Sequence, residues 1–537
     1  MCGILAILGT KILKEKNESL LKKLVGRGPE GGRVLEGDKF QLGFTRLAIN
    51  GLEPSGMQPM QGDGLAWMCN GEIYNYKELA KAYDIPIKGS DCSVIGPLFK
   101  KLGSMTDART FFQSLDGVFA MIIIDATAGI AYVARDPYGV RPLYVGYSAE
   151  AGGDVKRIVF ASELKALDLK DCAVIEAFPP GHYAAYDLNT LNRIGFEPYH
   201  TIPWMKNPSY SDSADAQKAL RCALEVAVKK RMMMERPVAA LLSGGLDSSL
   251  IAALVQKELV ASGKPALKTF SIGFEGSEDL RHARLVADHI GSEHTEIVMT
   301  PAEFFEAIPE VIKDIESYDI TTVRASVGNW LVSREISRRT DCKVVFNGDG
   351  SDEVLGGYKY FYSAPSDEAF ESETSRLLQD IHMFDVLRSD RCISSHGLEP
   401  RTPFLDKQFV AVAKSISTCL RRPVSGSMPE KQILRLAFND GLLPDAVLFR
   451  KKEAFSDGVS GLEKSWYQEC QERAESVVGL KWRGECEKFK HLKPLTAESY
   501  YYRSLFNQLY SSAEKCVPYL WMPQWVKATD PSARTLV

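Results

Sequence analysis

Long apolar segments are scarce in this sequence of 537 residues. No run reaches the roughly 18 apolar residues that a membrane-spanning helix needs, so we expect no membrane partner. The apolar start, MCGILAILG, is too short to span a bilayer, and it lacks the preceding positive charge of a signal peptide. We interpret it as a first strand and expect a cytoplasmic protein.

A surplus of positive charge and clustered cysteines are also lacking. The formal net charge is -4, so no basic excess is available to attract nucleic acid or anionic lipid. The 11 cysteines are scattered singly, without a CxxC pair or metal-ligand spacing. This pattern argues against a disulfide framework and a zinc site, and it favours a reducing compartment. Chemistry on small molecules is the class of function that remains.

The chain length favours two domains, because single hydrophobic cores stop growing near roughly 250 to 300 residues. Short apolar segments at hairpin-like spacing, such as 41–49 and 117–126, are typical of strands. They predict a layered, antiparallel α+β domain over residues 1–200. Residues 201–213 mix Pro, Asn and Ser without periodicity, and we interpret them as a linker.

After the linker, strand-like and helix-like segments alternate. Apolar strands are expected at 237–242, 267–274 and 342–348, separated by helical segments, which predicts a parallel α/β sheet. This second domain is expected over residues 214–520, mainly helical from about 365, with a polar tail at 521–537. Ligands of such sheets bind at the carboxyl ends of the strands.

Cys2 is a candidate nucleophile, since it follows Met1 directly and precedes Gly3. A small second residue normally allows the initiator methionine to be removed, which would leave Cys2 as the first residue. Its own α-amino group, with an ordinary pKa near 7.7 to 8.0, could then take the thiol proton. No histidine precedes His182 to serve as that base. The alternative is a core-facing cysteine in a strand, which position alone favours.

Several polar residues of the first domain suggest a receptor for a free amino acid. Arg46 can pair with an α-carboxylate, and Glu72 and Asp91 can bind an α-ammonium group. Asn70 and Gly71 offer a side-chain amide and a backbone N–H to a developing oxyanion. Each signal alone is weak, because a strand-end arginine is usually solvated and an Asn-Gly pair is usually a turn. Their coexistence with Cys2 supports the functional interpretation.

The segments MCGI, RGPE, FTRLAI, MQPM, CNGEIYN, GSDC, ARDPYGVRPLY, FASELKAL and FPPGH resemble the class II glutamine amidotransferase domain. The resemblance covers the whole first domain. It implies an N-terminal-nucleophile fold of two stacked antiparallel sheets between helices, in which Cys2 attacks the glutamine amide, forms a thioester and releases ammonia. The resemblance also implies that Asn70 and Gly71 act with Cys2 in catalysis. Glutamine-binding positions are implied at Arg46, Leu47, Ala48, Ile49, Asn50, Asn70, Gly71, Glu72 and Asp91.

A second candidate site begins with LLSGGLDSS at 241–249, where two glycines lie between a strand and a helix. Backbone N–H groups at such a turn can face phosphate oxygens. The lysine of a P-loop is missing, which argues against simple γ-phosphoryl transfer. Asp247 could hold Mg²⁺ on the phosphates. The alternative is an ordinary turn whose Ser and Asp cap the helix.

The turn FNGDGSDEVLGGY offers Asp349, Asp352 and Glu353 after another strand. One interpretation is an ordinary solvated loop. The other is a binding site, because carboxylates at this edge of a parallel sheet suit ATP with Mg²⁺.

The string SGGLDSS resembles the PP-loop of enzymes that adenylate a substrate and release pyrophosphate. ESYDITTVRAS, SSHGLEPRTPFLD, MPEKQILR and RKKEAFSDG extend the resemblance, over nearly the entire chain, to the glutamine-hydrolysing asparagine synthetases. It implies a homodimeric, ATP- and Mg²⁺-dependent ligase. In this reaction the aspartate β-carboxylate attacks the α-phosphorus of ATP, and ammonia then displaces AMP from β-aspartyl-AMP to give asparagine.

The same resemblance assigns roles to residues of the second domain. ATP contacts are implied at Leu242, Ser243, Gly244, Gly245, Asp247, Ser248, Ile272, Gly348 and Asp349. Asp247 and Asp352 fall at the Mg²⁺ positions, and Thr321, Arg324 and Asp349 at contacts to aspartate or the intermediate. Arg324 and Lys452 are implied to be catalytic. Among three consecutive cations we choose Lys452 by its spacing to Glu453, as a charge over the transferring phosphoryl group.

Three residues depart from the pattern of many relatives: Asn347 replaces Ser, Asp349 replaces Glu with a side chain one methylene shorter, and Pro400 replaces Ala.

One rival interpretation is a synthetase that amidates or cyclises another acid, but the β-lactam-forming relatives lack a working N-terminal cysteine. Another is a catalytically silent binding protein that keeps the fold. For the enzyme, we expect an ammonia path lined by small and apolar residues between the domains.

Overall fold

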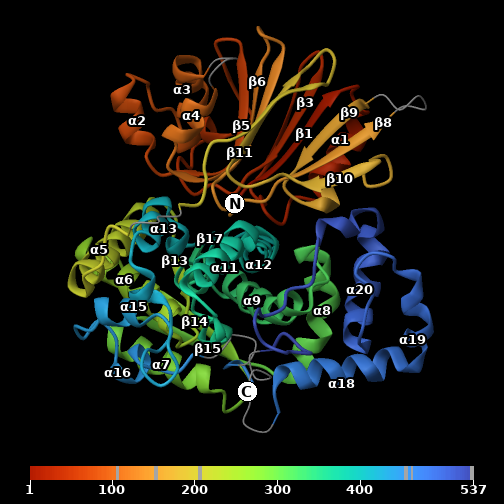
Figure 1. The fold of residues 1–537 in the computed structure, drawn as a ribbon. Coiled ribbons are helices and arrows are strands. Elements are labelled where there is room, and N and C mark those ends of the chain that lie inside the picture. Colours follow the sequence, from red (N-terminus) through yellow and green to blue (C-terminus); the bar gives the residue numbers. More distant parts are fainter. Residues whose placement is uncertain (104–107, 150–154, 204–207, 453–457, 461–463, 533–537) are drawn as a thin grey trace.

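The computed structural model describes residues 1–103, 108–149, 155–203, 208–452, 458–460 and 464–532. Figure 1 shows a β-rich amino-terminal domain stacked on a larger, mainly helical second domain. Residues 204–207 of the expected linker and 533–537 of the expected tail lie outside the described residues. The described end of the linker pairs with the second domain, where Ser209 N–H donates to the carbonyl oxygen of Ser415 at 2.9 Å.

Two six-stranded sheets stack in the amino-terminal domain, and neighbouring strands are antiparallel throughout. Their orders are β10-β8-β9-β1-β3-β2 and β12-β11-β7-β6-β5-β4. This arrangement confirms the predicted antiparallel sandwich. The strands are β1 (Gly3–Gly9), β2 (Gly32–Glu36), β3 (Phe40–Thr45), β4 (Met60–Gly62), β5 (Leu65–Ile73), β6 (Gly117–Asp125), β7 (Ile130–Arg135), β8 (Tyr144–Ala149), β9 (Val155–Ala161), β10 (Val174–Ala177), β11 (His182–Asp187) and β12 (Arg193–Pro198).

Alternation along β1 places its side chains in two cores. Ile4 and Leu8 join the buried cluster between the sheets, whereas Leu5 and Ile7 face the opposite side. This period of two follows from strand geometry. The helices of this domain cover the outer faces of the sheets, as α1 (Lys14–Lys22), α2 (Tyr76–Ala82), α3 (Ile95–Leu102) and α4 (Ala108–Ser114).

The second domain is built on a five-stranded sheet of order β15-β14-β13-β16-β17, in which every neighbouring pair is parallel. The predicted parallel α/β domain is therefore confirmed. Its strands are β13 (Val238–Leu241), β14 (Lys268–Gly273), β15 (Glu293–Val298), β16 (Val344–Phe346) and β17 (Glu399–Arg401).

Helices follow or flank these strands, and the chain beyond 365 is mainly helical, as predicted. The helix that bears most on the site is α9, whose first turn is capped by Asp319 through a 2.8 Å bond from Thr322 N–H. The helices are α5 (Ser213–Arg231), α6 (Leu246–Ala261), α7 (Glu278–Ile290), α8 (Pro301–Ile315), α9 (Ile320–Arg339), α10 (Ser351–Leu355), α11 (Asp367–Asp380), α12 (Asp385–Ser394), α13 (Lys407–Lys414), α14 (Thr418–Arg421), α15 (Gln432–Ala437), α16 (Asp445–Leu448), α18 (Trp466–Val478), α19 (Trp482–Glu485) and α20 (Ala497–Tyr510). None of the helices in the described ranges has the length and apolar character needed to cross a membrane.

Strand β17 was not predicted. It has three residues, Glu399, Pro400 and Arg401, and no apolar run marks it. All three are nevertheless buried, and they pair in register with Val344 to Phe346 of β16. Position 400 is thus an edge position of the sheet, where a proline that donates no hydrogen bond is tolerated.

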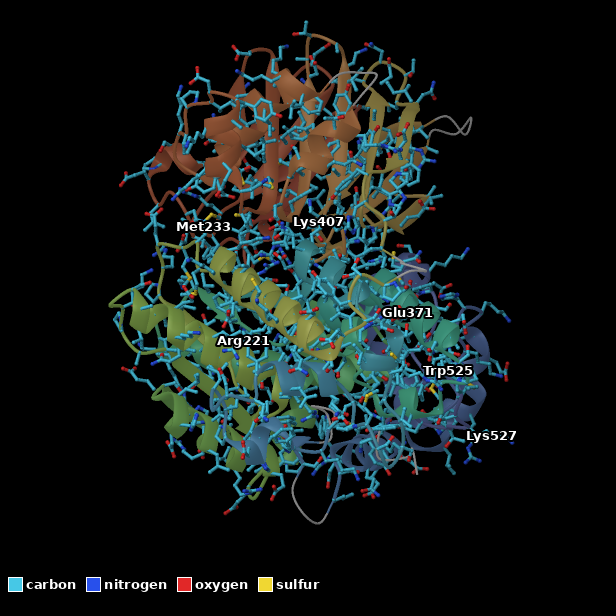
Figure 2. The ribbon with its side chains drawn as sticks, turned by 60° about the vertical axis from the view of Figure 1, so that its left-hand side comes forward. Arg221, Met233, Glu371, Lys407, Trp525 and Lys527 are labelled. Carbon is cyan, nitrogen blue, oxygen red and sulfur yellow. The ribbon has the colours of Figure 1, made fainter. Side chains whose placement is uncertain are left out.

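The two domains meet along buried ion pairs. Arg27 of the first domain lies 2.7 Å from Asp390 of α12. Lys407, labelled at the seam in Figure 2, donates to a carbonyl oxygen of the first domain at 3.0 Å. The chain begins at the same seam (Figure 1), where the amino nitrogen of Met1 lies 3.2 Å from Glu399. A site in the first domain is therefore within reach of residues from the second.

Candidate active sites

Cys2 lies immediately before β1, half-buried, with its Sγ 3.8 Å from the carbonyl oxygen of Leu47. Its backbone N–H donates to Asn70 Oδ1 at 3.1 Å. Asn70 Nδ2 is buried and has no hydrogen-bond partner in the described part of the chain. A buried amide donor without a partner is available to an oxygen that develops negative charge.

Gly71 follows Asn70 on β5 in a conformation that requires glycine. Its φ is +155°, and a Cβ atom there would lie 2.0 Å from the carbonyl oxygen of Val118. Strand β6 therefore approaches so closely that no side chain fits. The thiol, the free amide donor and the glycine backbone thus lie close together.

A cavity beside Cys2, which we call the first cavity, collects the predicted glutamine-binding residues. All of them line it except Asn70, which is tied to Cys2 by the hydrogen bond above. Its walls are Cys2, Phe44, Arg46, Leu47, Ala48, Ile49, Asn50, Gly56, Gln58, Gly71, Glu72, Ser90, Asp91, Cys92 and Glu399. Glu399 was not predicted, and no local signal could have found it, because it comes from β17 of the other domain.

Two buried carboxylates, Glu72 and Asp91, lie in the first cavity. Asn50 Nδ2 donates to Glu72 at 2.5 Å, and Ile73 N–H donates to Asp91 at 2.7 Å. Burial raises the pKa of Asp91 to about 6, and burial together with the nearby Asp91 raises the pKa of Glu72 well above its usual value. Burial and mutual repulsion disfavour the charged forms of these two carboxylates, and a bound ammonium group would stabilise them.

Arg46 offers the opposite charge in the same cavity. Its guanidinium group donates to the carbonyl oxygens of Glu53, at 3.1 Å, and Gly51. Among the described residues no carboxylate pairs with it, so its charge is available to a substrate carboxylate. Carboxylates on one side and a guanidinium group on the other are the features that a free α-amino acid needs.

Burial raises the pKa of the Cys2 thiol to about 11, so the thiol holds its proton near neutral pH. A base must therefore act on it. The amine of Met1, the preceding residue, is paired with Glu399. Removal of Met1 would place the amine on Cys2 itself, beside Asn70 Oδ1.

The second cavity lies at the carboxyl ends of the parallel strands. The loop that follows β13 borders this cavity. In it, Ser243 N–H lies 3.2 Å from Ser248 Oγ, so the loop folds onto the start of α6. Gly244 has φ of +71°, and a Cβ atom there would lie 2.5 Å from the backbone of α7. The loop is thus tight, and the amino end of a 16-residue helix faces the cavity.

Two lysines and two aspartates meet next to this loop. Lys431 Nζ lies 2.5 Å from Asp247 and 2.6 Å from Asp352, and Lys452 Nζ lies 2.6 Å from Asp352 and 3.8 Å from Asp247. Lys431 was not predicted as a site residue. Its signal was present in the segment MPEKQILR, but lysine next to a helix is usually solvated, and only the fold brings it here.

Opposite charges in this cluster stabilise the charged forms of Asp352 and Lys452. Burial alone would raise the pKa of Asp352, but the ammonium groups of Lys431 and Lys452 hold it below its usual range. Burial alone would likewise lower the pKa of Lys452, but Asp352 and Asp247 raise it. Asp352 and Lys452 are therefore both charged at neutral pH.

The donor set also fits Mg²⁺. Magnesium is typically held by one or two carboxylates together with waters and substrate phosphates, and Asp247 and Asp352 supply such a pair beside the phosphate-type loop. A closed cage made by protein alone is not formed, since no group of three His, Cys, Asp or Glu suited to a metal occurs in the described ranges.

The far end of the second cavity carries Asp349 and Arg388. Arg388 Nη2 lies 2.9 Å from Asp349 and 2.8 Å from Asp385. The second oxygen of Asp349 and the hydroxyl of Thr321 are buried without hydrogen-bond partners among the described residues. These groups can therefore receive a polar ligand. Arg388 and Asp385 were not predicted, because nothing in the spacing of α12 distinguishes them from a solvated helix face.

Asn347 also has a local role. Its side-chain amide donates to Ser389 Oγ of α12 at 2.6 Å and its carbonyl oxygen accepts from Asp349 N–H at 3.4 Å. The departure at this position thus ties the acidic turn to α12.

Most predicted residues of the second domain line the second cavity, and two do not. The lining includes Leu242, Ser243, Gly245, Asp247, Ser248, Ile272, Thr321, Gly348, Asp349, Asp352 and Lys452. Gly244 belongs to the loop but packs against α7 and does not line the cavity. Arg324 does not line the cavity and forms ion pairs with Glu498 at 2.6 Å and Asp530 at 2.8 Å. Residues 453–457 of the RKKEAFSDG segment, with Glu453, lie outside the described residues.

Comparison with known proteins matches both domains. A family model described as "Glutamine amidotransferase domain" matches residues 1–211, and one described as "Asparagine synthase" matches residues 219–373 and 363–530. The chain is 41% identical to an "Asparagine synthetase [glutamine-hydrolyzing]" of Gallus gallus and 40% identical to proteins of the same name from Homo sapiens and Rattus norvegicus. Each alignment covers 100% of this chain and 98% of the relative.

Proposed function

The chain belongs to the family of glutamine-hydrolysing asparagine synthetases, and we propose that its two cavities carry out the two halves of that reaction through β-aspartyl-AMP. It is an ATP-using ligase that takes nitrogen from glutamine. The observation that carries the assignment of the second cavity is the cluster of Lys431 and Lys452 on Asp247 and Asp352 beside the amino end of α6.

In the first cavity, Arg46 binds the α-carboxylate of glutamine, and Glu72 with Asp91 binds its α-ammonium group. The sulfur of Cys2 attacks the side-chain carbonyl carbon, and the thiol proton passes to the α-amine that Cys2 would carry without Met1. Asn70 Nδ2 and the N–H of Gly71 stabilise the oxyanion. The departing nitrogen takes this proton from the α-ammonium group and leaves as ammonia, and water then hydrolyses the thioester to glutamate.

In the second cavity, the β-carboxylate of aspartate attacks the α-phosphorus of ATP and pyrophosphate leaves. Loop residues from Leu242 to Ser248, with Ile272 and Gly348, hold the nucleotide. Lys452 and Lys431 neutralise the charge that accumulates on the phosphates. Mg²⁺ on Asp247 and Asp352 would add positive charge at the pyrophosphate. Ammonia then displaces AMP from the acyl carbon.

Aspartate is assigned to the far end of the second cavity. The unpartnered oxygens of Asp349 and Thr321 can accept and orient its polar groups, and Arg388 supplies a cation for a carboxylate. Arg388 holds the carboxylate of Asp349 in place, which compensates for a side chain that is one methylene shorter than glutamate. Arg324 does not line this cavity.

Passage of ammonia between the cavities is part of the proposal. The first cavity is bordered by Glu399 of the second domain, so it lies against that domain. Buried charged residues, such as Arg27 and Asp390, and buried apolar residues, such as Ile49 and Val140, both lie where the domains meet. The path itself stays a prediction. Trapping of ammonium in solvent during glutamine turnover tests it, because near-complete release would contradict a protected passage.

A homodimeric assembly, a cytoplasmic location and the absence of nucleic-acid and membrane partners stay predictions. They derive from the resemblance and the composition.

Labelled aspartate tests the proposed chemistry. If the β-carboxylate carries heavy oxygen, attack on the α-phosphorus followed by ammonia transfer leaves one labelled oxygen in AMP and one in asparagine. We expect labelled AMP, pyrophosphate and asparagine in equal amounts. Asparagine without label in AMP would exclude the adenylate, and failure of aspartate to support pyrophosphate release would indicate another acceptor acid.

A further inference from the structure

The last described part of the chain, residues 517–532, lies across the second domain without forming a helix or strand. We call it the C-terminal strap. Its first part is held by Tyr519, whose hydroxyl donates to Asp380 at 2.5 Å and accepts from Arg376 at 2.7 Å. Trp525 packs against an aromatic cluster, whereas Lys527 is exposed and projects away from the molecule (Figure 2).

Trp521 brings the strap to the second cavity. It is 8% exposed, lines the cavity, and has its ring centroid 5.6 Å from that of Tyr358, another lining residue. The hydroxyl of Tyr358 donates to Asp385 at 2.9 Å, and Asp385 pairs with Arg388. The indole is thus part of the wall at the end of the cavity that we assign to aspartate.

Two attachments fix the strap to the beginning of α9. The backbone N–H of Trp521 donates to Asp319, the N-cap of α9, at 2.8 Å. Further along the strap, Asp530 makes two bonds with Arg324, at 2.8 and 2.9 Å, and accepts from Gln471 at 3.0 Å. The same helix carries Thr321 into the cavity, so the strap and the substrate site share one support.

Arg324 is committed to these contacts. It is 3% exposed, and Glu498 holds its other side at 2.6 and 2.7 Å. A bidentate pair on each side fixes a guanidinium group in orientation as well as in position. Arg324 therefore does not line the cavity, and its side chain binds the strap at Asp530.

We propose that Trp521 positions aspartate and shields its adenylate from water, and that Arg324 is a positioning residue that latches the strap through Asp530. The inference rests on the proposed function of the second cavity. Two nucleophiles can attack the acyl carbon of β-aspartyl-AMP: ammonia gives asparagine and AMP, whereas water gives aspartate and AMP. A closed wall disfavours the second reaction.

The ratio of pyrophosphate released to asparagine formed measures this leak. We expect Trp521→Ala to raise the ratio about threefold and the KM for aspartate about tenfold. Trp521→Phe should restore much of both, because the phenyl ring keeps the wall. Asp530→Asn and Arg324→Lys should raise the ratio in the same direction, since each weakens the latch.

Lys527→Ala on the exposed side of the strap and Trp482→Ala in α19 are the controls, and both should keep the wild-type ratio. Glutamine hydrolysis without ATP reports on the intact first cavity in every variant. If Trp521→Ala and Asp530→Asn slow synthesis but leave the ratio and the KM unchanged, the strap is merely structural and the inference is wrong. Failure of the proposed function would differ, because wild-type protein itself would then form no asparagine.

Discussion

Arg401 Nη2 lies 3.3 Å from Glu72 Oε1, so a guanidinium group of the second domain pairs with a carboxylate that lines the first cavity. The same guanidinium lies 2.7 Å from Glu399. The carbonyl oxygen of Arg401 accepts from Asn347 N–H at 3.1 Å, at the start of the acidic turn of the second cavity. One residue of β17 thus contacts both sites.

Arg401→Met should destabilise the protein strongly, because it leaves Glu72 and Glu399 buried without their shared cation. The expected loss is about 3 to 5 kcal/mol, as for other broken buried ion pairs. Urea denaturation of the variant and of Arg339→Met, an exposed arginine paired with Glu335, measures the effect. The control should lose at most about 1 kcal/mol. Equal small losses would contradict a structural role for the buried pair.

Glutamine use should depend on the ionisation of Asp91. Its pKa is raised to about 6 by burial, and only the charged form attracts the α-ammonium group. As the pH falls through about 6, kcat/KM for glutamine should therefore fall, by about tenfold per pH unit at the low end. Above that pH the profile should be flat with respect to this group. Asp91→Asn should lower kcat/KM and remove the inflection, and its persistence in the variant would assign it to another group.

Gly71→Ala should abolish most glutamine hydrolysis. The added methyl group would lie 2.0 Å from the Val118 carbonyl oxygen, so β5 must move beside Cys2 and the oxyanion donors are displaced. We expect a loss of about 100-fold or more in the steady-state rate of glutamate formation. Gly62→Ala on β4 is a matched control, because its nearest neighbour is 3.9 Å away. Comparable losses in both variants would argue for general damage to the sheet.

Lys431→Met should impair the second cavity alone. It removes one of the two cations that neutralise Asp247 and Asp352, and bonds to charged groups of this kind contribute enough to lower kcat/KM for ATP by about 10- to 100-fold. Pyrophosphate release at varied ATP measures the effect. The exposed Lys257 serves as control through Lys257→Met. An unchanged or improved kcat/KM for ATP would show that Lys431 only balances charge.

Sequence patterns predicted the parts of the sites whose signal lies within a few neighbouring residues. Cys2, the SGGLDSS loop and the acidic turn each lie within a few residues of a strand end, so their chemistry and their element can be inferred together. Glu399, Lys431 and Trp521 could not be found in this way. Each is brought to its site by a contact between segments far apart in sequence, and each has an ordinary surface or core role as its default interpretation.

Strand β17 and Arg324 illustrate two further limits. Glu399 to Arg401 form a strand because β16 offers them a ladder, and periodicity cannot detect three residues whose side chains are mostly charged. The role of Arg324 was carried over from a resemblance and remains a prediction. Its observed partners, Glu498 and Asp530, lie far along the chain, and only the fold reveals that they surround it.

The most direct test of the account compares Cys2→Ala with the intact protein, using first glutamine and then ammonium as the nitrogen source for asparagine synthesis. Cys172→Ala, which removes a buried thiol elsewhere in the first domain, controls for loss of a cysteine. Because Cys2 supplies only the nitrogen, Cys2→Ala should lose glutamine-dependent synthesis and keep ammonium-dependent synthesis. Glutamine-dependent synthesis that survives in Cys2→Ala would contradict the division of the reaction between two cavities.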